Sequence, residues 1–167
     1  PGPNTVPLIY PGNFGASGFI EWPKVGSRKP VAIARTPKSE DLLVPAGTYV
    51  LIRRFSSKEE RRRVVAAIFD SSRVSTLPVG FENHLNYFHK TGGGLPMSLA
   101  KGLTAFLNST LVDTYFRQLN GHTQVNATDL RSLRYPPLET LAALGEQIDD
   151  AIPVQADLDC LVERSLF

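Results

Sequence analysis

The hydrophobic residues of this chain change their spacing at Gly92-Gly93-Gly94, and that change constrains the fold more than any other feature of the sequence. Before the three glycines, short apolar runs alternate with stretches rich in Pro and Gly, which is typical of strands joined by turns. After them, apolar residues recur every three or four positions, which is typical of amphipathic helices. The sequence therefore predicts a strand-rich first part and a helical second part.

The clearest strand signal lies in residues 48–55, where β-branched, aromatic and basic side chains alternate between two faces. A further strand is predicted over residues 81–88, with Phe81, Leu85 and Tyr87 on one face. Its other face would carry Glu82, His84, Asn86 and Phe88. Shorter strands are expected at residues 6–10, 18–22, 31–34 and 64–69, and single helical turns near residues 36–43 and 56–60.

In the second part, helical spacing predicts a hairpin or kinked pair of helices, broken at Asn108-Ser109 and closed by Asn120-Gly121. A short capped turn is expected at residues 126–133. An amphipathic helix then runs from Leu138 until Pro153 interrupts it, and a last helix follows.

Charge divides the chain more sharply than its net value of +2 suggests. Residues 1–138 hold 17 Lys and Arg against 9 Asp and Glu, whereas residues 139–167 hold 1 against 7. A polyanion would be attracted to the first part and repelled by the second. We therefore expect a binding domain over residues 1–138 and an acidic helical extension over residues 139–167.

Several classes of protein are disfavoured by composition. No apolar stretch is long enough for a membrane span, and the N-terminus lacks the pattern of a signal peptide, so we expect a cytoplasmic protein without membrane contact. Cys160 is the only cysteine, which precludes an intrachain disulfide and fits a reducing compartment. Because the chain begins Pro1-Gly2-Pro3 without methionine, we expect a fragment, with a processed N-terminus or tag remnant as the alternatives.

The densest group of cations is a run of six within eleven residues, which suits contact with phosphates. Its members are Arg53, Arg54, Lys58, Arg61, Arg62 and Arg63. The alternative is a solvated turn in which Glu59 pairs locally with Arg62 or Arg63.

Catalytic motifs are weak or incomplete. Tyr135-Pro136-Pro137-Leu138 has the two prolines of an adenine methyltransferase tetrapeptide but the wrong flanking residues, and a glycine-rich stretch at residues 14–18 precedes a strand rather than a helix. A metal site at Glu82, His84 and His89 is disfavoured because a single strand would place His89 on the opposite face. We therefore expect no catalytic residue, cofactor or metal in this chain.

Four blocks in order resemble the target-recognition region of bacterial restriction–modification N6-adenine DNA methyltransferases. They are residues 49–63 (YVLIRRFSSKEERRR), 80–86 (GFENHLN), 107–113 (LNSTLVD) and 121–130 (GHTQVNATDL). The specificity subunits of type I systems carry a looser version of the last two blocks. The resemblance covers residues 8–145.

This resemblance implies an α+β recognition domain, with an irregular, twisted β portion followed by a helical hairpin and C-terminal amphipathic helices. It also implies a separate catalytic methyltransferase domain or subunit, which would bind S-adenosylmethionine outside this chain. The expected partners are therefore double-stranded DNA and that catalytic part. Whether the parent also cleaves DNA is left open.

A recognition module must register the duplex through phosphates and read base edges with forked donors and acceptors. The six cations named above are the phosphate candidates, and the candidates for base or backbone contact are Asn83, His84, Asn86, His89 and Lys90. In residues 122–126 the polar side chains suit DNA, but Asn126 also suits a helix N-cap and Gln124 a buried loop, and we favour the structural role. Trp22 and Phe14 are expected in the core rather than stacked on bases.

The sequence thus predicts a DNA-recognition module without enzymatic activity of its own. The alternative is a protein–protein docking module that acts through the acidic helices after residue 138.

Overall fold

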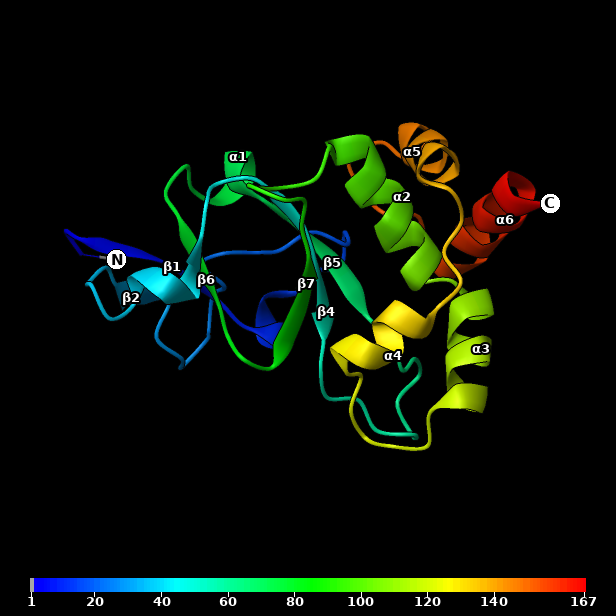
Figure 1. Cartoon of the computed structure of the whole chain (residues 1–167), viewed down its shortest axis with the longest axis horizontal. Helices are drawn as coiled ribbons and strands as arrows, with labels where there is room; N and C mark the ends of the chain where they lie inside the picture. Colours follow the sequence, from blue (N-terminus) through cyan, green and yellow to red (C-terminus); the bar gives the residue numbers. More distant parts are fainter. Residues whose placement is uncertain (1) are drawn as a thin grey trace.

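The computed structural model describes residues 2–167, which form two β-sheets and a layer of helices stacked side by side (Figure 1). The strands lie in the first part of the chain and the longer helices follow residue 96, so the predicted α+β class is confirmed. Short helical segments connect the strands: η1 (Pro11–Asn13), η2 (Glu40–Leu42) and α1 (Ser71–Val74). No helix among these residues is long and apolar enough to cross a membrane.

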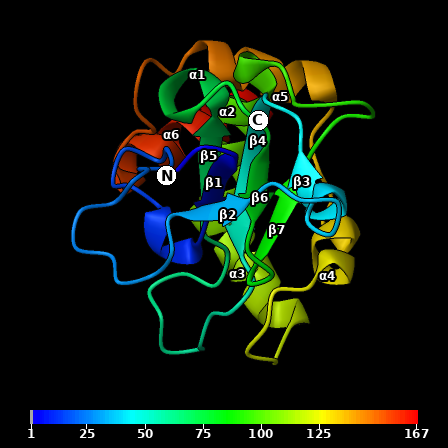
Figure 2. The same ribbon diagram turned by 90° about the vertical axis from the view of Figure 1, so that its left-hand side faces the viewer.

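The first sheet lies at the end of the molecule that carries the N-terminus, in front of the other layers in Figure 2. Its strands, in spatial order, are β2 (Ala32–Ala34), β1 (Thr5–Ile9), β6 (Val79–Phe81) and β3 (Leu43–Val44). β1 and β6 pair in parallel, with Leu8 opposite Gly80, and the other pairs are antiparallel.

The second sheet is antiparallel and occupies the middle of the molecule (Figure 1). β4 (Thr48–Arg53) is its central strand, flanked by β5 (Ala66–Asp70) and β7 (Leu85–Phe88). Residues 49–52 are all buried, because alternate side chains face different layers. Val50 and Ile52 join the core with the helices, whereas Tyr49 and Leu51 join the core between the sheets.

The predicted strand over residues 81–88 is wrong. β6 ends at Phe81 in the first sheet and β7 begins at Leu85 in the second, with a turn between them. Within that turn the Glu82 carboxylate accepts the His84 backbone N–H at 3.0 Å, and the Leu85 N–H donates to the Glu82 carbonyl at 3.0 Å. Apolar and polar residues alternate in each of the two strands, so in the sequence the two strands resemble a single one.

The helical layer covers the face of the second sheet that points away from the first (Figure 1). Its members are α2 (Met97–Leu107), α3 (Thr110–Leu119), α4 (Ala127–Ser132), α5 (Leu138–Glu146) and α6 (Gln155–Leu166). The predicted break between the first two helices is confirmed: Ser109 is the N-cap of α3 and its hydroxyl accepts from the Val112 N–H at 3.3 Å.

α2 and α5 cross at two glycines. A Cβ atom at Gly102 would overlap the Leu141 carbonyl oxygen, and one at Gly145 would overlap the Ser98 carbonyl oxygen. Only glycine allows the two helix backbones to approach this closely. Helix α5 is thereby fixed directly on the helix that covers the sheet.

The acidic segment contributes to the same hydrophobic core as the rest of the chain. Leu144 in α5 and Leu158 and Val162 in α6 are fully buried in the cluster that contains Val50 and Ile52 of β4. The sharp change in charge near residue 138 therefore coincides with no break in packing. Deleting residues 139–167 would expose this core.

Candidate nucleic-acid interface

Three loops meet at one end of the second sheet, at the lower side of the molecule in Figures 1 and 2. They are residues 54–63 after β4, the turn 82–84 before β7, and residues 120–125 between α3 and α4. We call this surface the loop face. It contains most of the residues that the sequence indicates for contact with DNA.

The first two loops are joined through backbone and aromatic contacts. The Arg54 N–H donates to the His84 carbonyl at 2.9 Å, and the Arg54 side chain donates to the Asn83 carbonyl at 3.4 Å. The rings of Phe55 and His84 lie 5.1 Å apart between centroids. Asn83 and His84 are therefore neighbours of the basic run, although about thirty positions separate them in sequence.

The third loop pairs with the first. The Ser56 N–H donates to the Thr123 carbonyl at 3.0 Å, and the Val125 N–H donates to the Arg54 carbonyl at 2.7 Å. Phe55 and Gln124 form an isolated antiparallel bridge. These backbone bonds fix the position of the two loops relative to each other.

Asn126 and Asn120 hold the ends of the third loop. The predicted N-cap role of Asn126 is confirmed, because it forms a capping box with Asp129 at the start of α4. The buried Asn120 side chain donates to the Gln124 carbonyl at 3.2 Å and to Asp129 at 2.9 Å. His122 and Thr123, between these anchors, are exposed.

Arg63, one of the phosphate candidates, lies inside the protein with 1% of its surface exposed. Its guanidinium donates to the Ser56 hydroxyl at 3.0 Å, to the Asn120 carbonyl at 3.4 Å and to the His122 carbonyl, and it lies 5.7 Å from the centre of the Phe116 ring. Arg63 therefore joins the first loop to the third loop and to α3. Because its donors are occupied and buried, Arg63 no longer belongs among the residues that we expect to touch a phosphate.

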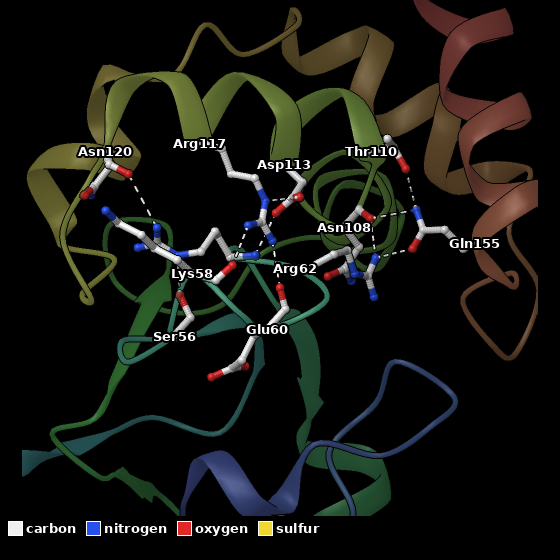
Figure 3. Close-up of polar contacts among 11 residues, drawn as sticks. Ser56, Lys58, Glu60, Arg62, Asn108, Thr110, Asp113, Arg117, Asn120 and Gln155 are labelled. Atoms are coloured by element: carbon white, nitrogen blue, oxygen red, sulfur yellow. Dashed lines mark hydrogen bonds and ion pairs between the residues drawn. The ribbon is translucent and has the colours of Figure 1, made fainter.

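Arg62 is also turned inward, toward the helices (Figure 3). It donates to the Asn108 carbonyl at the end of α2 and to the Gln155 side chain of α6 at 2.5 Å. Burial, and to a lesser extent the neighbouring Arg61, lowers the pKa of the Arg62 guanidinium from its ordinary value. Arg62 therefore fastens the basic run to the helical layer, and we remove it too from the phosphate candidates.

The remaining cations of the run differ in their exposure and in whether they form ion pairs. Arg53 lies 3.4 Å from the Glu60 carboxylate, and both side chains are about one-third exposed, at 35% and 36%. Arg54 is half-buried, whereas Lys58 and Arg61 are exposed. Within residues 2–167, Arg54, Lys58 and Arg61 form no ion pair. The predicted local pairing of Glu59 with Arg62 or Arg63 does not occur.

Arg117 extends from α3 to the loop that carries the basic run (Figure 3). Its guanidinium donates to the backbone carbonyls of Lys58 at 2.9 Å and Glu60 at 2.8 Å, and to the Asp113 carboxylate at 2.7 Å. The other oxygen of Asp113 accepts the Arg63 N–H at 2.6 Å. Neither Arg117 nor Asp113 was predicted from the sequence as part of this site. The spacing of four between an acid and a base on one helix was the signal that could have identified the pair.

This network replaces the helical turn predicted near residues 56–60. The chain forms a hydrogen-bonded turn there, in which the Ser57 N–H donates to the Glu60 carboxylate at 3.2 Å, without becoming a helix. The side chains of Lys58 and Arg61 are thereby presented outward by a loop that is held on its inner side.

Asn86 and His84 have partners within the protein. The Asn86 side chain donates to the Val125 carbonyl at 2.8 Å, which ties β7 to the third loop. A ring nitrogen of His84 lies 2.5 Å from the Glu82 carboxylate, and 48% of the His84 side chain is exposed. Asn83 is exposed at the tip of the turn. Of these residues, Asn83 and His84 remain available to a ligand, whereas the Asn86 amide supports the fold.

His89 and Lys90 follow the opposite end of β7, away from the loop face. Both are exposed, and the His89 ring lies 5.4 Å from that of Tyr87. A groove of about 620 Å³ runs between β7 and α4 and is lined by Asn86, His89 and Arg131 among others. None of the residues that line this groove belongs to the loop face, so His89 and Lys90 lie apart from it.

Other motifs singled out in the sequence have structural partners. The Tyr135 hydroxyl donates to the Leu130 carbonyl at 2.6 Å, burial raises the pKa of that hydroxyl, and Pro137 is the N-cap of α5. Trp22 and Phe14 pack against the core between the sheets, as predicted. Within residues 2–167, no three His, Cys, Asp or Glu side chains are grouped so as to hold a metal.

No protein-family model matches the chain, and no solved structure matches it. Two curated proteins do. The chain is 48% identical over 163 residues to the type II methyltransferase M.PstI of Providencia stuartii, which covers 98% of this chain and 32% of M.PstI. It is 47% identical over 169 residues to the type II methyltransferase M.BsuBI of Bacillus subtilis, which covers 100% of this chain and 33% of M.BsuBI. This chain is therefore homologous, over nearly its whole length, to about one third of each of two type II methyltransferases.

Proposed function

We propose that this chain is the duplex-DNA recognition module of an adenine-specific restriction–modification methyltransferase, and that it positions DNA for a catalytic region outside this chain. The homology to type II methyltransferases supports the link to modification enzymes. Adenine specificity rests on the resemblance of the four sequence blocks. The parent protein would bind S-adenosylmethionine in its catalytic region.

The observation that carries this proposal is the construction of the loop face. Arg63, Arg117 and Asn120 hold the first and third loops from within, and the turn 82–84 is bonded to Arg54. Lys58 and Arg61 are exposed and have no carboxylate partner among the described residues. A surface that is preordered and cationic binds phosphates without the cost of ordering its loops. Arg54, Asn83 and His84 adjoin these cations and supply donors and acceptors for the edges of bases.

A salt titration tests the proposal. We expect the chain to bind random duplex at about 50 mM salt and to lose affinity steeply toward about 200 mM, because neutralised phosphates release counterions. Binding would be measured by fluorescence anisotropy with a labelled duplex. The absence of binding at the lower salt concentration would contradict the proposal.

Charge reversal then locates the site. The double variant Lys58→Glu/Arg61→Glu is expected to abolish binding while leaving the melting temperature unchanged, because both side chains are exposed. The matched control is Lys38→Glu/Arg164→Glu, which reverses one exposed Lys and one exposed Arg outside the loop face. Equal losses in the two double variants would indicate a general effect of net charge and would contradict the assignment of the site.

A second candidate function is docking of the remaining part of the methyltransferase polypeptide. An apolar groove of about 660 Å³ lies between α3, the segment before α5 and the end of α6, and includes Leu111, Tyr115 and Phe167. Phe167 is 95% exposed. The relatives are about three times as long as the matched region, so a large part of their chain is available as the occupant. Helix α6 would act here through the apolar side chain of Leu166 as well as through its acidic charge.

This second function predicts that Leu111→Ser/Tyr115→Ser leaves DNA binding by this chain unchanged. In the full-length methyltransferase, the same variant would increase protease cleavage between the two regions and lower methylation of DNA. Unchanged cleavage and methylation would contradict docking at this groove.

A further inference from the structure

A second cationic surface lies outside the loop face, around a hollow of about 450 Å³ between η1 and the loop that follows Pro23. The hollow is lined by Tyr10, Gly12, Asn13 and residues 24–29. Three of these residues, Lys24, Arg28 and Lys29, carry positive charge, and none of the described residues that line the hollow is a carboxylate.

The walls of this hollow are fixed by hydrogen bonds. The Asn13 side chain accepts from the Tyr10 N–H at 2.8 Å and donates to the Glu21 carbonyl at 2.8 Å. On the opposite wall, the Ser27 N–H donates to the Lys24 carbonyl at 3.3 Å. An anion entering the hollow would therefore meet a preformed surface.

The three cations are held to different degrees. Lys24 donates to the Phe14 carbonyl at 3.3 Å and lies 3.9 Å from the Glu21 carboxylate, so its charge is partly compensated. The Lys29 ammonium lies 4.7 Å from the centre of the Tyr10 ring, an interaction that positions the charge without neutralising it. Arg28 is exposed and forms no ion pair within residues 2–167. Arg28 and Lys29 therefore offer most of the free charge.

The position of this loop relates it to the proposed function. In Figure 1, residues 22–31 extend toward the lower side of the molecule, and in the perpendicular view of Figure 2 they extend to its left, above the level of the basic loop. They come from the opposite layer, next to the first sheet, whereas the loop face adjoins the helices. The two cationic surfaces thus lie in different layers of the protein.

We propose that this hollow binds a phosphate of the DNA backbone and acts as a second anchor, remote from the loop face. The inference rests on the proposed function, because a duplex bound to the loop face is what brings a phosphate to this hollow. Contacts to phosphates at two separated points set the register and orientation of a duplex, which a single cluster of cations cannot do. Arg28 and Lys29 would make the contact, and Lys24 would add to the local potential.

The test is a salt titration of the full 167-residue chain carrying Arg28→Ala/Lys29→Ala, with labelled duplex. We expect the slope of log affinity against log salt to fall in magnitude by about 1, because one neutralised phosphate contributes about 0.9. The matched control is Lys38→Ala/Arg164→Ala, which removes one exposed Lys and one exposed Arg elsewhere and should leave the slope unchanged.

The outcomes separate this inference from the proposed function. If the unaltered chain binds duplex and Arg28→Ala/Lys29→Ala retains its slope, the second anchor is overturned while DNA recognition stands. If the unaltered chain does not bind duplex, both are overturned. The anchor would also be overturned if the slope of log affinity against log salt fell as much in the control variant as in the test variant.

A further arm distinguishes backbone phosphate from a free anion. Inorganic phosphate and duplex are titrated separately, and the backbone amide signals of residues 24–29 are followed by NMR. We expect the duplex to shift these amide signals in the unaltered chain but not in Arg28→Ala/Lys29→Ala. Shifts with inorganic phosphate alone, and none with duplex, would identify a site for free anions and overturn the proposal.

Discussion

Arg117 and Asp113, one helical turn apart on α3, form an ion pair at 2.7 Å whose two members hold the middle and the C-terminal end of the basic loop. The arginine binds the carbonyls of Lys58 and Glu60, and the aspartate binds the N–H of Arg63. The loop that we propose to contact DNA is therefore positioned by a helix that the DNA need not touch.

The first prediction concerns this positioning. Arg117→Lys keeps the charge, but a single ammonium cannot reproduce the three directed bonds of the guanidinium. We expect it to weaken duplex binding nearly as much as Arg117→Ala and to destabilise the fold by about 1 kcal/mol. Urea unfolding and anisotropy measure the two effects. Faster hydrogen exchange at residues 58–63 would identify loosening of the loop as the cause, and wild-type binding by Arg117→Lys would refute this role.

A second prediction separates two neighbours in the basic run. Arg63→Ala leaves the Ser56 hydroxyl and the carbonyls of Asn120 and His122 without their buried donor, which should lower the free energy of unfolding by about 3 kcal/mol. Arg61→Ala should change that free energy by less than about 0.5 kcal/mol, because the side chain is exposed, yet weaken DNA binding. Denaturant unfolding and anisotropy of both variants test the contrast. Similar stabilities would show that Arg63 is not a buried hub.

A third prediction concerns the crossing of α2 and α5. Replacing glycine by alanine within an exposed helix usually stabilises it by about 1 kcal/mol. At Gly145 the sign should reverse, because the added Cβ would overlap the Ser98 carbonyl oxygen and force the helices apart. We expect Gly145→Ala to lower the melting temperature by more than about 5 °C. Gly93→Ala is the control, since no atom lies within 4 Å of the added methyl; equal melting temperatures for the two variants would exclude the close crossing.

The fourth prediction is a dependence of stability on pH through Asp159. Burial raises the pKa of this carboxyl, but hydrogen bonds from Thr110 and Gln155 and the nearby charge of Arg62 outweigh it, so the pKa is lowered overall. A lowered pKa in the folded state contributes stability above the unfolded value of about 3.9, and that contribution is lost as the pH falls through the folded value.

Asp159→Asn should therefore be less stable than the unaltered chain at pH 7, and the difference should shrink below about pH 4. Urea unfolding at several pH values measures it. Asp157→Asn, on the same helix and exposed, is the control and should change the stability by less than about 0.5 kcal/mol. A difference for Asp159→Asn that does not vary with pH would contradict the account.

The sequence predicted local structure correctly where a pattern of residues is compatible with only one kind of element. The strand at β4, the break at Asn108-Ser109 and the N-cap at Asn126 all follow from periodicity and capping residues. The strand over residues 81–88 was wrong because alternation is also what two separate strands produce. Only the Glu82 carboxylate, which bonds the His84 N–H, marks the turn between them.

The candidate site was predicted from the local density of cations, which says nothing about where each side chain points. Six neighbouring cations have nearly the same local chemistry, so nothing in the sequence separates Arg61 from Arg63. In the structure Arg61 faces outward and Arg63 is buried beneath it. The loop 24–29 was not singled out at all, because its cations are few and its place relative to the loop face depends on how the first sheet stacks on the second.

Sequence alone determined the division into a strand-rich first part and a helical second part, and the concentration of positive charge before residue 138, because propensity, capping and net charge are properties of neighbouring residues. Only the tertiary structure decided which arginines support the fold, where the three loops meet, and that the acidic helices share the core. Those outcomes depend on contacts between residues far apart in the chain, and such contacts form only when the layers pack together.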